Sequence, residues 1–125
     1  HNSEFIIQNS SRSGVLAINS QGDLVASGSG TFGKLNLSIA KPALALSNTE
    51  EVATGSAGVS AISSLEREIT IRNDLVTENS LIYITPVGSG ASTPYLMRQV
   101  PRQSFTVGIP TVNTEETRFN WLIIN

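Results

Sequence analysis

Two strand patterns separated by a polar loop fill residues 104–124, which read SFTVGIPTVNTEETRFNWLII. The apolar residues that alternate with small or polar ones are Phe105, Val107 and Ile109 in the first pattern and Phe119, Trp121 and Ile123 in the second. Because successive side chains of a strand point to opposite faces, each pattern predicts a strand with one apolar face. The continuous apolar run that ends the second pattern indicates burial on both faces, either centrally in a sheet or under a neighbouring subunit.

Further strand patterns precede this stretch at residues 68–72, 81–85 and 95–100. Turn-forming residues separate them, and residues 88–94 read as the tip of a hairpin. No window sustains apolar residues at helical spacing for more than a turn or two, so we expect an all-β fold, an antiparallel β-sandwich over residues 34–125. The candidates for its aromatic core are Tyr83, Phe105, Phe119 and Trp121.

Residues 34–64 are less regular. Leu35, Leu37 and Ile39 alternate, which predicts a half-buried strand, and another short apolar run covers residues 43–46. Residues 48–51, Asn-Thr-Glu-Glu, read as a turn.

Residues 1–33 form a second region with its own pattern, an N-terminal β-strand or shaft segment. The short strand pattern of residues 5–10 recurs at residues 16–21, and a third follows at 23–26 after a turn that contains Gly22. Such short strands need neighbours, which come either from their own domain, as ordinary edge hairpins, or from other copies. For pairing with other copies, the predicted assembly residues are Phe5, Ile7, Leu16, Ile18 and Leu24.

Composition excludes several classes of protein. The chain has 125 residues, a net charge of -2 and only 14% charged residues, without the basic cluster of a nucleic-acid-binding protein. No apolar stretch is long enough for a transmembrane helix. Cysteine is absent, so stability must come from sheet packing, subunit association or a bound ion, which favours oligomerisation.

The inventory of reactive residues argues against an enzyme. The single histidine is His1, no thiol exists, and no serine lies in a Gly-x-Ser-x-Gly turn. Glu66 and Glu68 share a strand face with Thr70 and Arg72, which is most simply a solvated face with a cross-strand ion pair. We therefore expect no catalytic residues, no cofactor and no metal; Asp74 and Glu78 lack the spacing of a calcium-binding loop. The other acidic pairs, Glu50-Glu51 and Glu115-Glu116, lie in expected turns.

Four residues of the second half are candidates for contact with a ligand or a subunit. Arg98, Arg102 and Arg118 lie on segments that we expect to be adjacent, and together they would bind an acidic glycan or a neighbouring subunit's carboxylates. The alternative that we favour is that these charges protect sheet edges from unwanted pairing. Tyr95 is a candidate for stacking on a sugar, although packing is the simpler role.

Two parts of the chain resemble known surface proteins. Residues 5–11 and 16–24 resemble the short shaft repeats of phage-tail-fibre-like surface proteins, in which an apolar strand and a polar turn precede a Ser/Asn-x-Gly-x-Leu step. Residues 75–86, 100–107 and 119–123 are similar to the C-terminal β-domain of large bacterial surface proteins found in small-genome uncultivated lineages. The resemblance implies an extracellular β-fibre with a terminal β-domain, often trimeric, and the small number of repeats here leaves a linear strand-exchanged filament equally open.

These observations give two expectations for function. The first is a structural subunit of an extracellular homo-oligomeric fibre or filament, on a cell surface or a virion, whose partners are other copies of itself joined by strand pairing. The second is an adhesin head or carbohydrate-binding module at a fibre tip, whose partner is a surface glycan.

Overall fold

In the computed structural model the described residues, 5–8, 14–37, 44–88, 90 and 92–125, form β-strands and connecting segments without a helix. The chain divides into two compact units, His1–Leu35 and Asn36–Asn125. The expected boundary lies between residues 33 and 34. The fold is all-β, as the sequence predicted.

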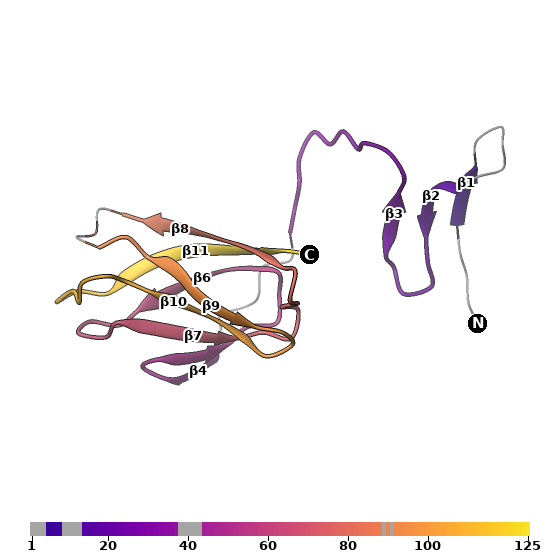
Figure 1. Cartoon of the computed structure of the whole chain (residues 1–125). Coiled ribbons are helices and arrows are strands. Elements are labelled where there is room, and N and C mark those ends of the chain that lie inside the picture. The colour runs from indigo at the N-terminus through magenta and orange to yellow at the C-terminus, as the bar shows by residue number, and fades with distance from the viewer. Residues whose placement is uncertain (1–4, 9–13, 38–43, 89, 91) are drawn as a thin grey trace. The chain divides into compact units, whose positions relative to one another are not determined.

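The first unit contains one sheet of three antiparallel strands, which we call the N-terminal sheet (Figure 1). Its strands are β1 (Phe5–Gln8), β2 (Gly14–Ile18) and β3 (Leu24–Ala26), in that order across the sheet. The register places Ile7 opposite Leu16, and Ile18 opposite Leu24. Short strands that follow one another along the chain therefore pair as a simple meander.

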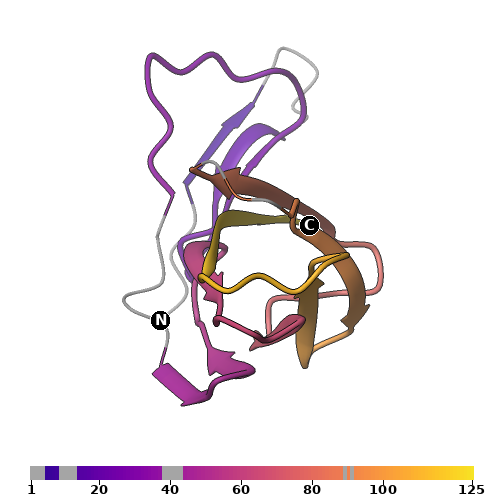
Figure 2. The ribbon, with the colours of Figure 1, turned by 90° about the vertical axis from the view of Figure 1, so that its left-hand side faces the viewer.

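The second unit is a sandwich of two sheets, seen along its strands in Figure 2. The larger, which we call the β10 sheet, has the order β4 (Leu44–Ser47), β5 (Glu50–Val52), β7 (Glu68–Arg72), β10 (Ser104–Gly108) and β9 (Tyr95–Val100). The smaller, the β11 sheet, has the order β6 (Ala57–Ile62), β11 (Thr117–Ile124) and β8 (Leu81–Val87). The pairs are antiparallel except β5 with β7, which is parallel.

The core lies between these two sheets and is built by the alternating residues of β7, β10 and β11. Phe105 and Trp121 meet edge to face, with ring centroids 5.2 Å apart. Gly58 lies directly opposite Trp121, and a Cβ atom at that position would lie 2.6 Å from Cε2 of the indole, so only glycine fits beneath the ring. The buried apolar residues are Ala53, Ile62, Ile69, Ile71, Val76, Phe105, Val107, Ile109, Phe119, Trp121 and Ile123.

The aromatic core prediction is confirmed for Phe105, Phe119 and Trp121 and wrong for Tyr83, which is 54% exposed. Ile82 and Ile84 take the inner face of β8 and pack against the core, so Tyr83 points to the outer face. Strand β11 is central in its sheet, as one of the two expected alternatives, but only its inner face is buried: Ile124 on the outer face is 44% exposed.

Three local predictions are also wrong. Glu50 and Glu51 begin strand β5 rather than forming a turn, because this segment pairs in parallel with β7. Residues 88–94 do not form a hairpin tip: β8 pairs with β11 and β9 with β10, so this connection crosses from one sheet to the other. Leu35 and Leu37 lie outside any strand, and Ile39 lies outside the described residues.

Candidate functional site

The N-terminal sheet leaves its apolar side chains uncovered. None of its side chains within the described residues is buried; Ile6 and Ile7 are each 45% exposed, Leu24 is 54% exposed and Val25 is 64% exposed. A single sheet has two faces, and burying apolar area is what stabilises it against the entropy of the chain. This sheet therefore carries apolar surface on both faces that its own unit does not bury.

Most of the assembly residues predicted from the sequence share one face of this sheet. Residues directly opposite one another in a ladder point to the same side, and the register links Ile7 with Leu16 and Ile18 with Leu24. Leu16 is half-buried and the other three are exposed. Phe5 lies in β1 opposite Ile18, but its side chain is outside the described residues.

The turn between β2 and β3 is built by one asparagine side chain. Oδ1 of Asn19 accepts hydrogen bonds of 2.9 Å from the backbone N–H groups of Gln21 and Asp23, and its Nδ2 donates to Asp23 Oδ2 at 3.0 Å. Gly22 has φ +87°, a conformation that suits glycine. This is the polar turn that the sequence predicted, and it sets the pairing of β2 with β3.

The outer face of the β11 sheet is a second uncovered apolar surface. Leu81 and Tyr83 on β8 are 57% and 54% exposed, and Val59 on β6 is 51% exposed. They lie in register with β11 residues of the same face, Leu81 opposite Ile124 and Tyr83 opposite Leu122. Sequence reasoning identified the apolar run of β11 but did not separate this outer face from the core.

The outer face of the β10 sheet is polar by contrast. Arg72 forms an ion pair with Glu50 across the parallel strands, and Nη2 of Arg98 lies 3.0 Å from Oε2 of Glu68. Both pairs are substantially exposed, so they contribute little to stability. This matches the solvated face with ion pairs that the sequence indicated around Glu68 and Arg72.

The three candidate arginines occupy different surfaces. Arg98 lies on β9 beside Glu68, Arg102 lies in the β9–β10 turn with φ +59°, and Arg118 lies on β11 in the other sheet. The structure therefore does not gather them into one anion site. Tyr95 begins β9 and is 46% exposed.

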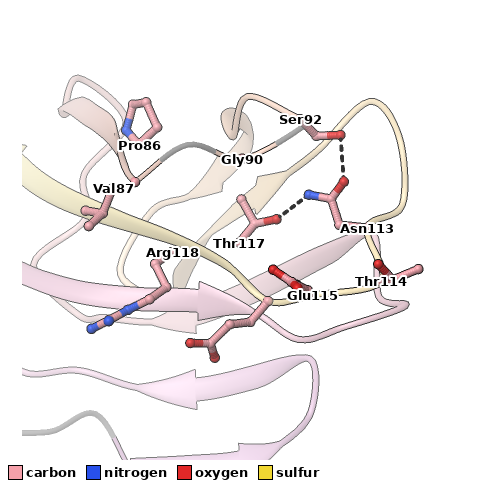
Figure 3. A pocket seen from close by; sticks show the side chains of 11 residues that line it. Pro86, Val87, Gly90, Ser92, Asn113, Thr114, Glu115, Thr117 and Arg118 are labelled. Carbon is pink, nitrogen blue, oxygen red and sulfur yellow. Dashed lines mark hydrogen bonds between the residues drawn. The ribbon is translucent and has the colours of Figure 1, made fainter.

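Arg118 borders a pocket of about 360 Å³ between the β8–β9 connection and the loop before β11 (Figure 3). Its polar wall is internally satisfied: Ser92 Oγ donates to the carbonyl of Thr111 at 2.6 Å, and Asn113 Nδ2 donates to Thr117 Oγ1 at 2.7 Å. Figure 3 shows Arg118 pointing away from Ser92 and Asn113. The described lining residues include no aromatic residue on which a sugar would stack.

One carboxyl group reaches between the two sheets of the sandwich. Glu51 lies on the inner side of β5, where Ser60 Oγ of β6 donates a hydrogen bond to its Oε1, and Trp121 Nε1 donates to Ser60 Oγ at 3.0 Å. Burial raises the pKa of Glu51, and the hydrogen bond from Ser60 opposes that rise. Sequence reasoning missed this chain of bonds because it expected Glu51 in a turn.

The described part of the chain has neither a cluster of metal-ligand side chains nor a long apolar helix. Within it, no three His, Cys, Asp or Glu side chains gather closely enough to hold a metal ion. It also contains no helix with the length and apolar character needed to cross a bilayer.

No protein-family model, curated protein or solved structure matches this chain.

Proposed function

We propose that the protein is a structural subunit of an extracellular homo-oligomeric fibre or filament, on a cell or virion surface, and that its copies join through strand pairing by the N-terminal unit. The observation that carries this proposal is the N-terminal sheet, whose described side chains include no buried residue and leave Ile6, Ile7, Ile18, Leu24 and Val25 exposed. Covering such side chains with a partner is favourable by roughly 1.5–3 kcal/mol for each one fully buried.

The sandwich supports this proposal because it folds around a core of its own. That core consists of eleven buried apolar residues between Ala53 and Ile123, and the N-terminal sheet contributes none of them. An adhesin head or glycan-binding module is the alternative function. It calls for a groove lined by at least two aromatic residues, and the exposed Tyr83 and Tyr95 lie on different sheets.

The test uses the full chain with Ile7→Lys and Ile18→Lys together, which place two charges on one face of the N-terminal sheet. We expect a fall in assembly of about tenfold or more by light scattering, because each lysine removes apolar area and adds a charge that resists burial. The matched control carries Leu65→Lys and Val112→Lys, two exposed apolar residues outside that sheet, and assembles normally. Assembly of the first variant at the level of the control would contradict the proposal.

A further inference from the structure

The four edge strands of the sandwich differ in how well they resist pairing with another chain. Strand β4 carries an irregularity between Ala45 and Ser47, and β9 carries one opposite Thr106 and Val107. Strand β8 contains Pro86. Bulges and prolines at edges are the devices that block unwanted pairing.

Strand β6 carries none of these devices. It reads Ala-Gly-Val-Ser-Ala-Ile over Ala57–Ile62, without charge or proline, and pairs with β11 in unbroken register. Within the described residues its other side has no neighbouring strand. An uncharged edge of this length, without a bulge, is a template for an added strand.

The register shows which backbone groups point to this free side. The N–H of Ile123 donates to the carbonyl of Ser56 directly opposite, at 2.7 Å. Because hydrogen-bonded and non-hydrogen-bonded pairs alternate along an antiparallel ladder, every second residue from Ser56 bonds β11. The residues between them therefore direct their N–H and C=O groups outward, and these are Ala57, Val59 and Ala61.

The same alternation explains Pro86 on the opposite edge of this sheet. Residues of β11 that bond β6 alternate with those that bond β8, so Asn120 bonds Thr85 and the backbone of Pro86 faces outward. The missing N–H of proline thus falls where a donor would meet an incoming strand. Pro86 closes one edge of the β11 sheet to pairing, and the other edge, that of β6, is open as far as the described residues go.

The edge of β6 lies on the same side of the sandwich as β4, the edge strand of the β10 sheet. Contacts between the sheets join β6 with β7 and β8 with β9, and Glu51 of β5 bonds Ser60 of β6. Strand β4 therefore extends beyond β6, and all four of its residues are exposed. If the β6 of a second sandwich paired with this β6, the β4 strands of the two copies would compete for the space beside the paired edges. A single sheet without a second layer has no such strand and would fit beside β6.

The N-terminal sheet of another copy is such a bare sheet, and its edge strand β1 suits this position. Ser27 N–H donates to the carbonyl of Val15, so the backbone of Val15 faces β3 and that of the next residue, Leu16, faces β1. Ile7 lies opposite Leu16 and therefore bonds β2, whereas the backbone of Ile6 faces outward. Adjacent side chains point to opposite faces, so Ile6 and Ile7, each 45% exposed, give β1 apolar contacts on both sides. A strand added beside β6 would have one face on the side of β4 and the other continuous with the outer face that carries Val59.

We propose that β1 of one copy adds to the open edge of β6 in a second copy, so that β6 is the acceptor strand of the assembly. This inference rests on the function proposed above. The N-terminal sheet then continues the β11 sheet of its neighbour, and Ile6 lies beside Val59 on the outer face. Backbone hydrogen bonds to Ala57, Val59 and Ala61 supply the pairing.

The first test is a disulfide that only this pairing brings together, in a chain that has no native cysteine. Full-length Ile6→Cys is mixed with Ala57→Cys, Val59→Cys or Ala61→Cys under mild oxidation; we expect a heterodimer band on a non-reducing gel with at least one of the three. The matched control is Thr85→Cys, because Thr85 and Val59 flank the same Asn120 on opposite edges. A band of equal strength with Thr85→Cys, or pairing through Ala26→Cys of β3 instead of Ile6→Cys, would overturn the assignment.

The second test removes one outward donor. Ala61→Pro deletes an N–H that makes no bond to β11, so the sandwich retains its ladder while assembly weakens about tenfold. Ala61→Lys places a charge at the same edge and is expected to act likewise if the proline perturbs folding, which circular dichroism would reveal. Unchanged assembly of both variants would refute β6 as acceptor and leave the proposed function standing, whereas a wild-type chain that stays monomeric would refute the proposed function itself.

Discussion

Glu51 is a carboxyl group whose position ties sheet packing to pH. Its partner Ser60 is buried and accepts a hydrogen bond from the indole N–H of Trp121, so the three side chains link β5, β6 and β11. Burial penalises the ionised form, which is why the pKa of Glu51 lies above its usual range. A group of this kind binds its proton more tightly in the folded chain than in the unfolded one.

Replacing Glu51 with glutamine therefore has a pH-dependent effect. As pH rises from the unfolded pKa of a glutamate through the raised folded pKa of Glu51, the folded state holds more protons and stability falls. Glu51→Gln stays neutral and accepts the same hydrogen bond, so the variant should be more stable than wild type at neutral pH, with the difference fading in acid. Thermal unfolding from pH 3 to 8 measures this. The control is Glu50→Gln on the exposed face; if both variants track wild type at every pH, burial does not govern Glu51.

At the level of single elements, the turn between β2 and β3 depends on Asn19. Its carbonyl oxygen accepts two backbone hydrogen bonds, so Asn19→Ala leaves the N–H groups of Gln21 and Asp23 without that acceptor. We expect a local loss of about 1–2 kcal/mol. Hydrogen exchange should speed up in β2 and β3, assembly should weaken, and the unfolding temperature of the sandwich should stay the same. In Gln21→Ala the backbone bonds remain, so equal effects from the two variants would contradict this role for Asn19.

The sequence was sufficient for the core of the sandwich wherever alternation was one-sided. Phe105 and Phe119 alternate with polar or small neighbours, so their faces were unambiguous, and both are buried. Strand β8 reads Leu-Ile-Tyr-Ile-Thr, apolar at successive positions, and alternation alone does not say whether Tyr83 or Ile84 points inward. The neighbouring sheet decides it, and that information lies in residues far along the chain.

The remaining errors also have non-local causes. Glu51 belongs to a strand because β7, many residues later, supplies its partner strand. The turn-like composition around Glu51 contains no information about that distant partner. The connection at residues 88–94 has the composition of a hairpin tip, but β8 and β9 bond different sheets. Leu35 and Leu37 have the alternation of a strand without a described partner that would supply a ladder. The three arginines were expected together as residues of adjacent β elements, but β11 lies in the other sheet from β9 and its turn.

For the whole molecule, the proposed contact uses two different surfaces, the edge of β1 on one copy and the edge of β6 on the next. Such a heterologous contact leaves one donor and one acceptor unused at the ends of every chain of copies, so assembly continues unless the rotation closes a ring. Winding of three N-terminal segments around one another, the trimeric alternative, closes after three copies and leaves no unused surface. The two architectures therefore differ in whether assemblies have ends.

A variant with only one working surface distinguishes them. The Ala61→Pro chain retains β1 as a donor but has a weakened acceptor, so in an open filament it caps the end at which it joins and prevents further addition there. Small amounts mixed into wild type should shorten the filaments steadily with dose in electron micrographs, while the untreated protein grows in mean mass with concentration under sedimentation. Ile7→Lys with Ile18→Lys, which blocks the donor, should cap the opposite end. A closed trimer of N-terminal segments would instead take up the Ala61→Pro chain without any change in particle size, and that result would exclude the linear arrangement.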